Sequence, residues 1–360
     1  MTPITFAIAG SGWRADFYLR IARAHPDRFQ VVGLMSRNEA KRRALEQTWG
    51  VRAFASVEEM VAATSPHFVV TSVPWEANPV VVRQLVELGM PVLSETPPAP
   101  DLDGLIEINK LAERGAKIQV AEQFHLQPHH AARIAVARSG VIGRISQAQI
   151  SAGHGYHGIS LIRKLLDVGF EPAVVSGFTF TSPLIDGPDR EGPPREERII
   201  ESEQMFLRFD FGDKLGLLDL TVDQYFAWVR NERVLVRGER GEIVNQSASY
   251  LKDYLTPIQL DFVRHATGVN GNLDGNYLNG IQFGDEWVYR PPFVPEGLTD
   301  EEIAIATCLI KMAEYVKGGP SFYSLAEASQ DHYLYLMGMK AIETGTPIQT
   351  RLTPWANVQK

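Results

Sequence analysis

The chain has 360 residues, of which 44% are hydrophobic, and its formal net charge is −8 at pH 7. This length exceeds one ordinary core and predicts two domains, while the negative charge argues against a nucleic-acid-binding protein, which needs a basic face. Cys308 is the one cysteine, so no disulfide can form within the chain, and its apolar neighbours predict a core residue. The sequence shows neither an apolar run of membrane-spanning length nor a signal-peptide pattern, which predicts a cytoplasmic protein with no membrane partner.

A predicted strand at the amino terminus leads directly into a glycine-rich turn. Ile4–Ala9 is an apolar run, and Gly10-Ser11-Gly12-Trp13-Arg14-Ala15 follows it with the spacing Gly-x-Gly-x-x-Ala. The first glycine permits a tight turn, the second lets backbone approach a pyrophosphate, and the small alanine lets a helix lie close to its strand. The phosphates would bind free N–H groups at the start of that helix. We therefore predict dinucleotide binding at Gly10, Ser11, Gly12, Trp13 and Arg14, with a tight turn that binds no ligand as the alternative.

Short apolar runs alternate with helical patterns as far as Val120. The predicted strands are Ile4–Ala9, Val31–Met35, Phe68–Thr71, Pro91–Leu93 and Lys117–Val120. The predicted helices cover Glu39–Trp49, Val57–Ala63, Asn78–Leu88 and Asp101–Arg114, with Asp101 as an N-cap. This alternation predicts an α/β fold in which helices cover both faces of a parallel sheet. We place this dinucleotide-binding domain at residues 1–122.

The remaining residues, 123–360, predict an α+β domain with a large, open, mostly antiparallel sheet. After a helical pattern at His129–Arg138, β-branched and aromatic runs predict strands at Ser146–Ala152, Ala173–Thr181, Gln204–Phe211, Leu215–Val222, Arg233–Arg237 and Gly241–Asn245. Turn residues at 211–214 and 237–241 predict hairpins. Asp186–Arg198 is rich in Pro, Gly and charge and predicts a mobile surface loop. Helices are predicted at Thr299–Lys317 and Ser324–Glu343, the last of them able to pack back on the first domain.

The predicted sheet leaves one apolar face without helices. A second subunit commonly buries such a face. We therefore expect a homodimer or homotetramer that assembles through the open sheet.

Several further motifs follow the glycine turn in a characteristic order. They are Val73-Pro74, Val92-Leu93-Ser94-Glu95-Thr96-Pro97, Val120–Pro128, His157–Leu166 and the final helical pattern from Glu327 to Ile342. With these motifs the chain resembles the glucose-fructose oxidoreductase / inositol dehydrogenase (Gfo/Idh/MocA) family over nearly its whole length. The resemblance implies a Rossmann domain, a second domain whose open sheet serves assembly, a nicotinamide coenzyme, and a sugar, polyol or related substrate.

The chain departs from the family pattern at the positions that carry the chemistry. In the resemblance, the usual catalytic lysine falls at Thr96, and the two usual aspartates fall at Gly153 and Ser160. The usual histidine of the helix after the fourth strand falls at Asn78, and the usual asparagine at the start of the second domain falls at Gln123. Of the active-site pattern, the histidine at His157 remains.

His157 is the predicted acid/base residue, because an imidazole exchanges a proton near neutral pH whereas a threonine hydroxyl at position 96 does not ionise there. Tyr156 and His154 are further catalytic candidates, each with a purely structural role as the alternative. The predicted substrate-binding residues are Thr96, Glu122, His125, His154 and His157. No metal is predicted, although His154, His157, His125 and Glu122 form a set that can in principle hold one.

The coenzyme prediction depends on the end of the second predicted strand, where NAD-binding proteins place an acidic residue against the ribose. Here Ser36 and Arg37 follow the strand: the serine brings no carboxylate to repel a 2′-phosphate, and the arginine can bind one. We therefore favour NADP, with NAD as the alternative. The resemblance adds Ser72, Val73, Pro74, Asn78, Glu95, Thr96 and Gln123 to the predicted coenzyme-binding residues.

The function predicted from these observations is an NAD(P)-dependent oxidoreductase that transfers hydride between a nicotinamide and a hydroxyl or keto carbon of a sugar, glycoside or polyol. Two alternatives remain open at this stage. One is a glycoside hydrolase or lyase that uses the nicotinamide transiently, with no net redox change. The other is a protein that binds NAD(P) without catalysis.

Overall fold

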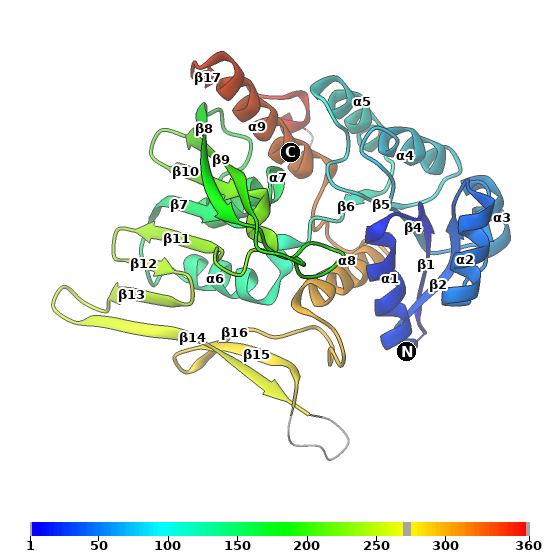
Figure 1. The fold of residues 1–360 in the computed structure, drawn as a ribbon, viewed down its shortest axis with the longest axis horizontal. Helices are drawn as coiled ribbons and strands as arrows, with labels where there is room; N and C mark the ends of the chain where they lie inside the picture. The colour runs from blue at the N-terminus through cyan, green and yellow to red at the C-terminus, as the bar shows by residue number, and fades with distance from the viewer. Residues whose placement is uncertain (1, 269–274, 358–360) are drawn as a thin grey trace.

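A computed structural model describes residues 2–268 and 275–357 of the chain. Two sheets lie side by side, each with its own helices, as Figure 1 shows. No helix among the described residues combines the length and apolar composition that crossing a membrane requires.

The first sheet has six parallel strands in the order β3-β2-β1-β4-β5-β6, which confirms the predicted dinucleotide-binding fold. Its strands are β1 (Ile4–Ala9), β2 (Phe29–Met35), β3 (Ala53–Phe54), β4 (Phe68–Thr71), β5 (Val92–Ser94) and β6 (Ile118–Val120). Its helices are α1 (Trp13–Ala24), α2 (Glu39–Trp49), α3 (Val57–Thr64), α4 (Asn78–Glu87) and α5 (Leu102–Glu113). Asp101 caps α5 as predicted, because its Oδ1 accepts the Gly104 N–H at 2.8 Å. Strand β3 was not predicted, because a strand of two residues is too short to show an alternating hydrophobic pattern.

The second sheet has eleven strands among the described residues, in the order β16-β15-β14-β13-β12-β11-β7-β10-β9-β8-β17, and only the β7–β10 pair is parallel. Its strands are β7 (Ile145–Ser151), β8 (Val174–Ile185), β9 (Ile199–Asp210), β10 (Leu215–Thr221), β11 (Arg233–Gly238), β12 (Gly241–Val244), β13 (Ser247–Leu251), β14 (Pro257–Thr267), β15 (Tyr277–Phe283), β16 (Glu286–Tyr289) and β17 (Ile348–Gln349). The predicted hairpins β9–β10 and β11–β12 are both present.

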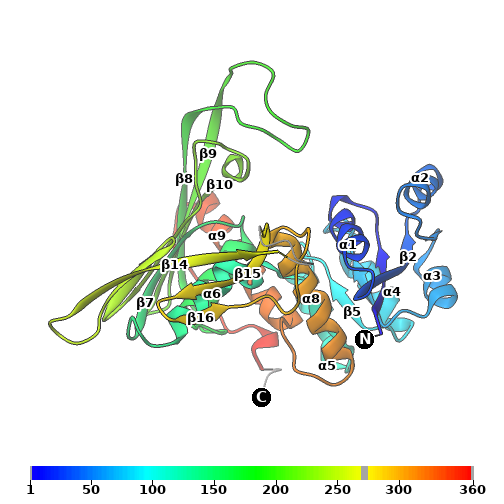
Figure 2. The same ribbon diagram turned by 90° about the horizontal axis from the view of Figure 1, so that it is seen from below.

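The helices of the second half are α6 (Pro128–Arg138), α7 (Tyr156–Leu166), α8 (Asp300–Val316) and α9 (Leu325–Thr344), with short 3-10 turns η1 (Phe124–Leu126), η2 (Val222–Tyr225) and η3 (Pro354–Asn357). Figure 2 shows α6, α8 and α9 on one side of the large sheet, while the opposite side of the sheet carries no helix. The large sheet is therefore covered on one face only.

Helix α8 completes the core of the first sheet although it belongs to the second half of the chain. Ile305, Leu309 and Met312 pack in one cluster with Phe6 and Ile8 of β1. Helix α9 also contacts this domain: Asn109 Nδ2 of α5 donates to Ser329 Oγ at 2.8 Å, as we expected for a last helix that packs back. The boundary between the two domains at residue 122 remains a prediction. Helices α8 and α9 come from the second half of the chain and pack on the first domain, so they connect the two domains.

Candidate active site

A cleft of about 680 Å³ lies where the carboxyl ends of β1, β2, β4 and β5 face the start of α7. We call it the interdomain cleft. Such a position, beside the reversal of strand order, is where open α/β sheets bind ligands. Its lining includes fifteen of the predicted site residues, namely Gly10, Ser11, Gly12, Trp13, Arg14, Ser36, Arg37, Ser72, Val73, Pro74, Glu95, Thr96, His154, Tyr156 and His157.

The glycine turn has the geometry that a bound phosphate group needs. Gly10 has φ +119°, and a Cβ there would lie 2.0 Å from the Ser72 carbonyl oxygen, so only glycine fits. Gly12 is the N-cap of α1 and offers no side chain to the first N–H groups of the helix. These donors remain available at the positive end of the helix dipole. The turn therefore fits the pyrophosphate of a dinucleotide.

The far end of the cleft carries positive charge. Arg37 and Lys41 both line it beside Ser36, whose hydroxyl accepts a hydrogen bond from Ser11 Oγ at 3.0 Å. Among the described residues that line the cleft, Glu95 is the one acid, and it lies beside Thr96 at the other end. A phosphate on the adenosine ribose would therefore meet two cations and no carboxylate.

A buried histidine–carboxyl pair stands at the α7 side of the cleft. His157 is the second residue of α7, and its Nδ1 lies 2.6 Å from Oε2 of Glu122, with both side chains at most 3% exposed. Glu122 Oε1 accepts the backbone N–H of Phe124 at 3.1 Å, which fixes the carboxyl group. This contact leaves Nε2 as the ring nitrogen that His157 can present to the cleft.

Burial shifts both pKa values toward the neutral forms. It raises the pKa of Glu122 to about 8, and the Phe124 N–H opposes that shift only in part. Burial likewise lowers the pKa of His157, with the positive charge of Arg14 adding to the effect. Because the two groups share a hydrogen bond, they titrate as a pair rather than independently.

Comparison with known proteins identifies the amino-terminal domain. Residues 4–123 match the model of the GFO_IDH_MocA family, an oxidoreductase family with an NAD-binding Rossmann fold. The match covers the amino-terminal domain, which is therefore similar to the Gfo/Idh/MocA family.

Curated proteins are similar to part of the chain. An uncharacterised protein of Saccharomyces cerevisiae is 27% identical over 117 residues, and inositol 2-dehydrogenase of Corynebacterium glutamicum is 29% identical over 104 residues. These alignments cover 31% and 28% of this chain and only 34% and 31% of the relatives' own lengths. A solved levoglucosan dehydrogenase in complex with NADH and levoglucosan shares the whole fold, with a TM-score of 0.69, 14% identity, and coverage of 96% of this chain and 99% of that one.

Gly153, where the resemblance to the family places an aspartate, has little room for a side chain. Gly153 has φ +65°, and a Cβ there would lie 3.0 Å from the Cβ of His157 and 3.1 Å from the Phe124 ring. Phe124 fills this space and stacks on the His157 ring, with centroids 4.4 Å apart. The carboxyl group that contacts the histidine therefore comes from Glu122, at the end of the first domain.

Thr96, at the position of the family's lysine, lines the cleft but carries no charge. Its Oγ1 donates to Glu95 Oε1 at 3.2 Å, and its carbonyl oxygen accepts the Tyr156 hydroxyl at 3.1 Å. Burial raises the pKa of Tyr156, with the negative charge of Glu95 adding to the effect. The hydrogen bond to the backbone carbonyl and the raised pKa favour the structural alternative for Tyr156, whose catalytic role remains a prediction.

His154 lines the cleft and binds a residue that sequence reasoning missed. Its Nδ1 lies 2.8 Å from the hydroxyl of Tyr225 in η2, and the same hydroxyl accepts the His154 backbone N–H at 2.9 Å. Burial lowers the pKa of His154 to about 3, so the ring is neutral near pH 7. Lys41 and Arg190, which also line the cleft, were missed as well. The sequence could have indicated Lys41, because it lies four residues after Arg37, in the first turn of the helix that follows.

Four predicted site residues do not line the cleft. Asn78 is fully buried, and its amide bonds Thr71, Ser94 and Pro98, so its position is structural and not coenzyme-facing. Gln123 is buried and His125 packs against the Tyr323 ring at 4.9 Å, outside the lining. Glu122 lies behind His157 and contacts that ring instead of the cleft. All four of these side chains are buried or packed away from the cleft lining.

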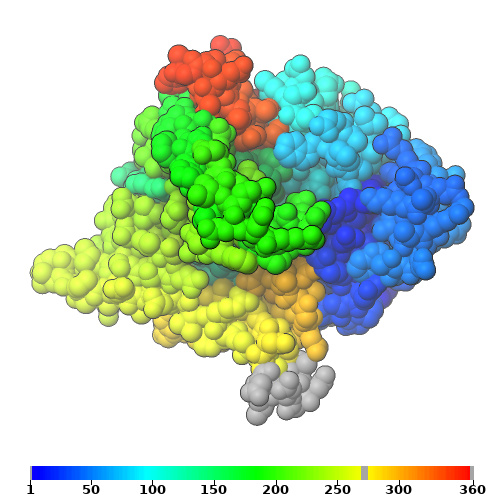
Figure 3. All heavy atoms as spheres, in the orientation of Figure 1, coloured from blue at the N-terminus to red at the C-terminus, as the bar shows by residue number. Residues whose placement is uncertain are grey.

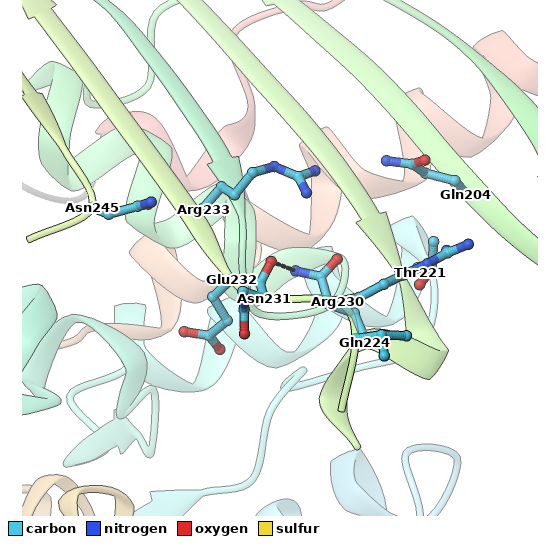
Figure 4. Close-up of a pocket in the computed structure, with 9 residues that line it drawn as sticks. Gln204, Thr221, Gln224, Arg230, Asn231, Glu232, Arg233 and Asn245 are labelled. Atoms are coloured by element: carbon cyan, nitrogen blue, oxygen red, sulfur yellow. Dashed lines mark hydrogen bonds between the residues drawn. The ribbon is translucent and has the colours of Figure 1, made fainter. Parts of the chain in front are cut away.

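A second hollow, of about 470 Å³, lies between the ends of β9, β10 and β11 (Figure 4). One hydrogen bond joins two of its lining residues, because Gln224 Nε2 donates to the Asn231 carbonyl at 3.0 Å. Arg233 Nη2 donates instead to Asp219 Oδ2, outside the lining, at 2.9 Å. It lacks a glycine turn and a histidine. The interdomain cleft is therefore the better candidate site.

Among the described residues, the group whose ligand atoms lie close enough together to hold a metal ion is His129, His130 and Glu232. It is not the set of four residues named in the sequence analysis. His130 Nδ1 lies 3.1 Å from Nη1 of Arg133, which can only donate. The ring proton of His130 is then on Nε2, so neither nitrogen offers a free lone pair. This cluster does not fit a metal ion well.

Proposed function

We propose that this protein is an NADP-preferring dehydrogenase that acts on a hydroxyl or keto carbon of a sugar, glycoside or polyol, with His157 as the acid/base residue. The observation that carries the proposal is the joint presence, in one cleft, of the glycine turn and of a histidine backed by a buried carboxyl group. When bound, the nicotinamide supplies the hydride acceptor or donor. The chain must then supply binding, orientation and proton transfer.

Proton transfer follows from the His157–Glu122 pair. When the pair holds two protons and has no net charge, the Glu122 carboxyl donates one of them in a hydrogen bond to Nδ1 of His157. The other proton is on Nε2, from which it can be transferred to a carbonyl oxygen of the substrate. After loss of one proton, Nδ1–H donates to the Glu122 carboxylate and Nε2 is a free acceptor for a hydroxyl proton. The pair thus provides an acid for reduction and a base for oxidation, which Thr96 cannot do.

Coenzyme preference rests on the far end of the cleft. Arg37 and Lys41 line this end and would supply two cations to a 2′-phosphate, while Ser36 brings no carboxylate that would repel it. These residues favour NADP over NAD.

The substrate class is inferred from the aromatic side chains near His157. The rings of Trp75 and Tyr156 meet edge to face at 5.9 Å, and both line the cleft. Aromatic faces suit the C–H faces of a sugar or polyol, while His154 and Thr96 offer polar atoms to its hydroxyl groups. The named relatives act on inositol or bind levoglucosan, which agrees with this class.

A test combines coenzyme binding with turnover. The purified protein is titrated with NADPH, then incubated with NADP⁺ and a panel of sugars, glycosides and polyols while the absorbance of reduced nicotinamide is followed. We expect turnover with at least one compound, and His157→Ala to lower kcat by about 10²- to 10⁴-fold with unchanged NADPH affinity. The exposed His67, changed to Ala, is the matched control. Equal turnover of parent and His157→Ala would refute the acid/base role, and coenzyme binding without turnover across the panel would refute the dehydrogenase.

A further inference from the structure

The loop between β8 and β9, residues 186–198, extends from the large sheet toward α1 of the first domain. Figure 2 shows this loop, which we call the arm, leaving the sheet, and Figure 3 shows its surface against that of the first domain. Its base is closed by the Asp186 N–H, which donates to the Arg198 carbonyl at 2.8 Å, and by Arg198 Nε, which lies 3.1 Å from Asp186 Oδ2. The arm is thus a defined continuation of the β8–β9 hairpin.

A tight turn at the tip of the arm presents Arg190. The Asp189 N–H donates to the Gly192 carbonyl at 3.0 Å, and Asp189 Oδ1 accepts the Glu191 N–H at 2.7 Å. Asp at the first and Gly at the fourth position are typical of such a turn. The local sequence therefore shapes the tip and leaves the Arg190 side chain free to point out of it.

Arg190 lies against the glycine turn of the other domain. Its guanidinium carbon is 4.1 Å from the centroid of the Trp13 ring, and Arg190 lines the interdomain cleft. Among the described residues, no carboxylate forms an ion pair with Arg190. By contrast, Arg14, whose guanidinium carbon lies 5.0 Å from the centroid of the Trp13 ring, is neutralised by Glu301 of α8 at 2.6 Å. Arg190 is therefore an uncompensated cation beside the phosphate-binding turn.

Trp13 fixes where this cation stands. It is the first residue of α1, directly after the Gly12 N-cap, and its ring packs edge to face on Phe17 with centroids 4.7 Å apart. Trp13 and Gly12 both line the interdomain cleft. The charge of Arg190 also contributes, after burial, His157 and Arg14, to the lowered pKa of His154. Arg190 thus stands between the glycine turn and the histidines.

We propose that Arg190 binds the coenzyme's pyrophosphate from the second domain, opposite the glycine turn. The inference rests on the proposed function and deepens it, because it assigns a coenzyme contact to the arm. A guanidinium binds phosphate oxygens through two N–H groups at once, and stacking on Trp13 keeps its plane in place before the ligand arrives. Because NADP and NAD share the pyrophosphate, Arg190 should act on both coenzymes alike.

The experiment measures dissociation constants of NADPH and NADH by calorimetry for the parent, Arg190→Ala, Arg190→Lys, Arg37→Ala and the control Arg195→Ala. Arg195 lies on the same arm, is exposed, and does not line the cleft. We expect Arg190→Ala to weaken both coenzymes by about tenfold or more, Arg190→Lys to recover part of the loss, and Arg195→Ala to bind like the parent. Arg37→Ala should weaken NADPH alone. Adenosine 2′-monophosphate, which lacks the pyrophosphate, should bind Arg190→Ala and the parent equally.

Three results would overturn the inference: parent-like affinity of Arg190→Ala for both coenzymes, an effect on one coenzyme only, or an equal loss in Arg195→Ala. Arg190 is exposed, so its replacement is not expected to unfold the chain, and matching thermal unfolding curves confirm this for each variant. Failure of the proposed function is distinguishable, because it would appear as a parent that binds coenzyme without turning over any compound of the panel, whereas this inference is judged by the coenzyme affinities of the variants.

Discussion

Glu122 determines what His157 can do at the scale of single residues. The carboxyl group is buried, its pKa is raised to about 8, and it contacts Nδ1 at 2.6 Å. Above this pH the pair has lost a proton and Nε2 is a base, whereas below it Nε2–H is an acid. We therefore expect the rate of alcohol oxidation to rise with pH through about 8, and the rate of carbonyl reduction to fall over the same range.

Glu122→Gln tests this assignment. A glutamine oxygen can still accept Nδ1–H but cannot hold a proton, so kcat should fall by about 10²- to 10⁴-fold and the step near pH 8 should disappear from the pH–rate profile. Glu122→Asp is the conservative control and should retain a pH step at lower activity. A Glu122→Gln profile that keeps the parent's step would show that another group titrates there.

The position of α7 matters at the scale of elements, because this helix carries His157 at its second residue. Arg163 on α7 binds Asp331 on α9 at 2.5 Å, and both side chains are at most 4% exposed. Its Nη1 also donates to the Glu327 carbonyl at 3.0 Å. This buried pair ties the histidine-bearing helix to the helix that packs on the first domain.

Asp331→Ala leaves the Arg163 guanidinium buried without its counter-ion. We expect the free energy of unfolding, measured by urea denaturation with circular dichroism, to fall by about 3–5 kcal/mol. Arg208→Ala, which removes a half-exposed ion pair with Asp210, is the control and should cost at most about 1 kcal/mol. Similar losses in both variants would mean that the α7–α9 pair adds no particular stability.

At the scale of the whole molecule, the helix-free face of the large sheet leaves apolar side chains in water. Phe178 and Phe180 on β8 are 60% and 59% exposed, and Phe178 stacks on Phe206 of β9 at 4.8 Å. Exposed apolar faces of this kind are typical of subunit interfaces. We propose that a second copy of the chain covers this face, which forms a homodimer or, with a further interface, a homotetramer.

Replacing both Phe178 and Phe180 by Asp should dissociate the assembly. We expect sedimentation velocity to show an oligomeric parent and a monomeric variant at the same concentration, because two charges would be buried without partners in the interface. Val80→Asp, at a residue of α4 that is 58% exposed on the first domain, should leave the parent's state unchanged. A monomeric parent would contradict the proposal.

Local patterns predicted much of this fold. The strands β1 and β4 and the helix α2 have the predicted bounds. Buried strands, glycine turns and helix caps each require particular residue types within a few positions, so the sequence shows them directly. The last strands before α8 were missed, although Ile258, Leu260 and Phe262 alternate with polar residues in β14. Their exposed and half-buried faces give a weaker signal than the buried runs of the first sheet.

By itself, the sequence determined the glycine turn and the two kinds of sheet, since each depends on residues that are neighbours along the chain. Only the tertiary structure decided that Glu122 supports His157 from behind, that Asn78 and His125 point into the protein, and that Arg190 reaches Trp13. These facts depend on which way a side chain turns after distant segments pack together. The hydrophobic pattern of a segment does not predict the direction of such a side chain. That direction depends on the space and the hydrogen-bonding or packing partners that the rest of the fold provides.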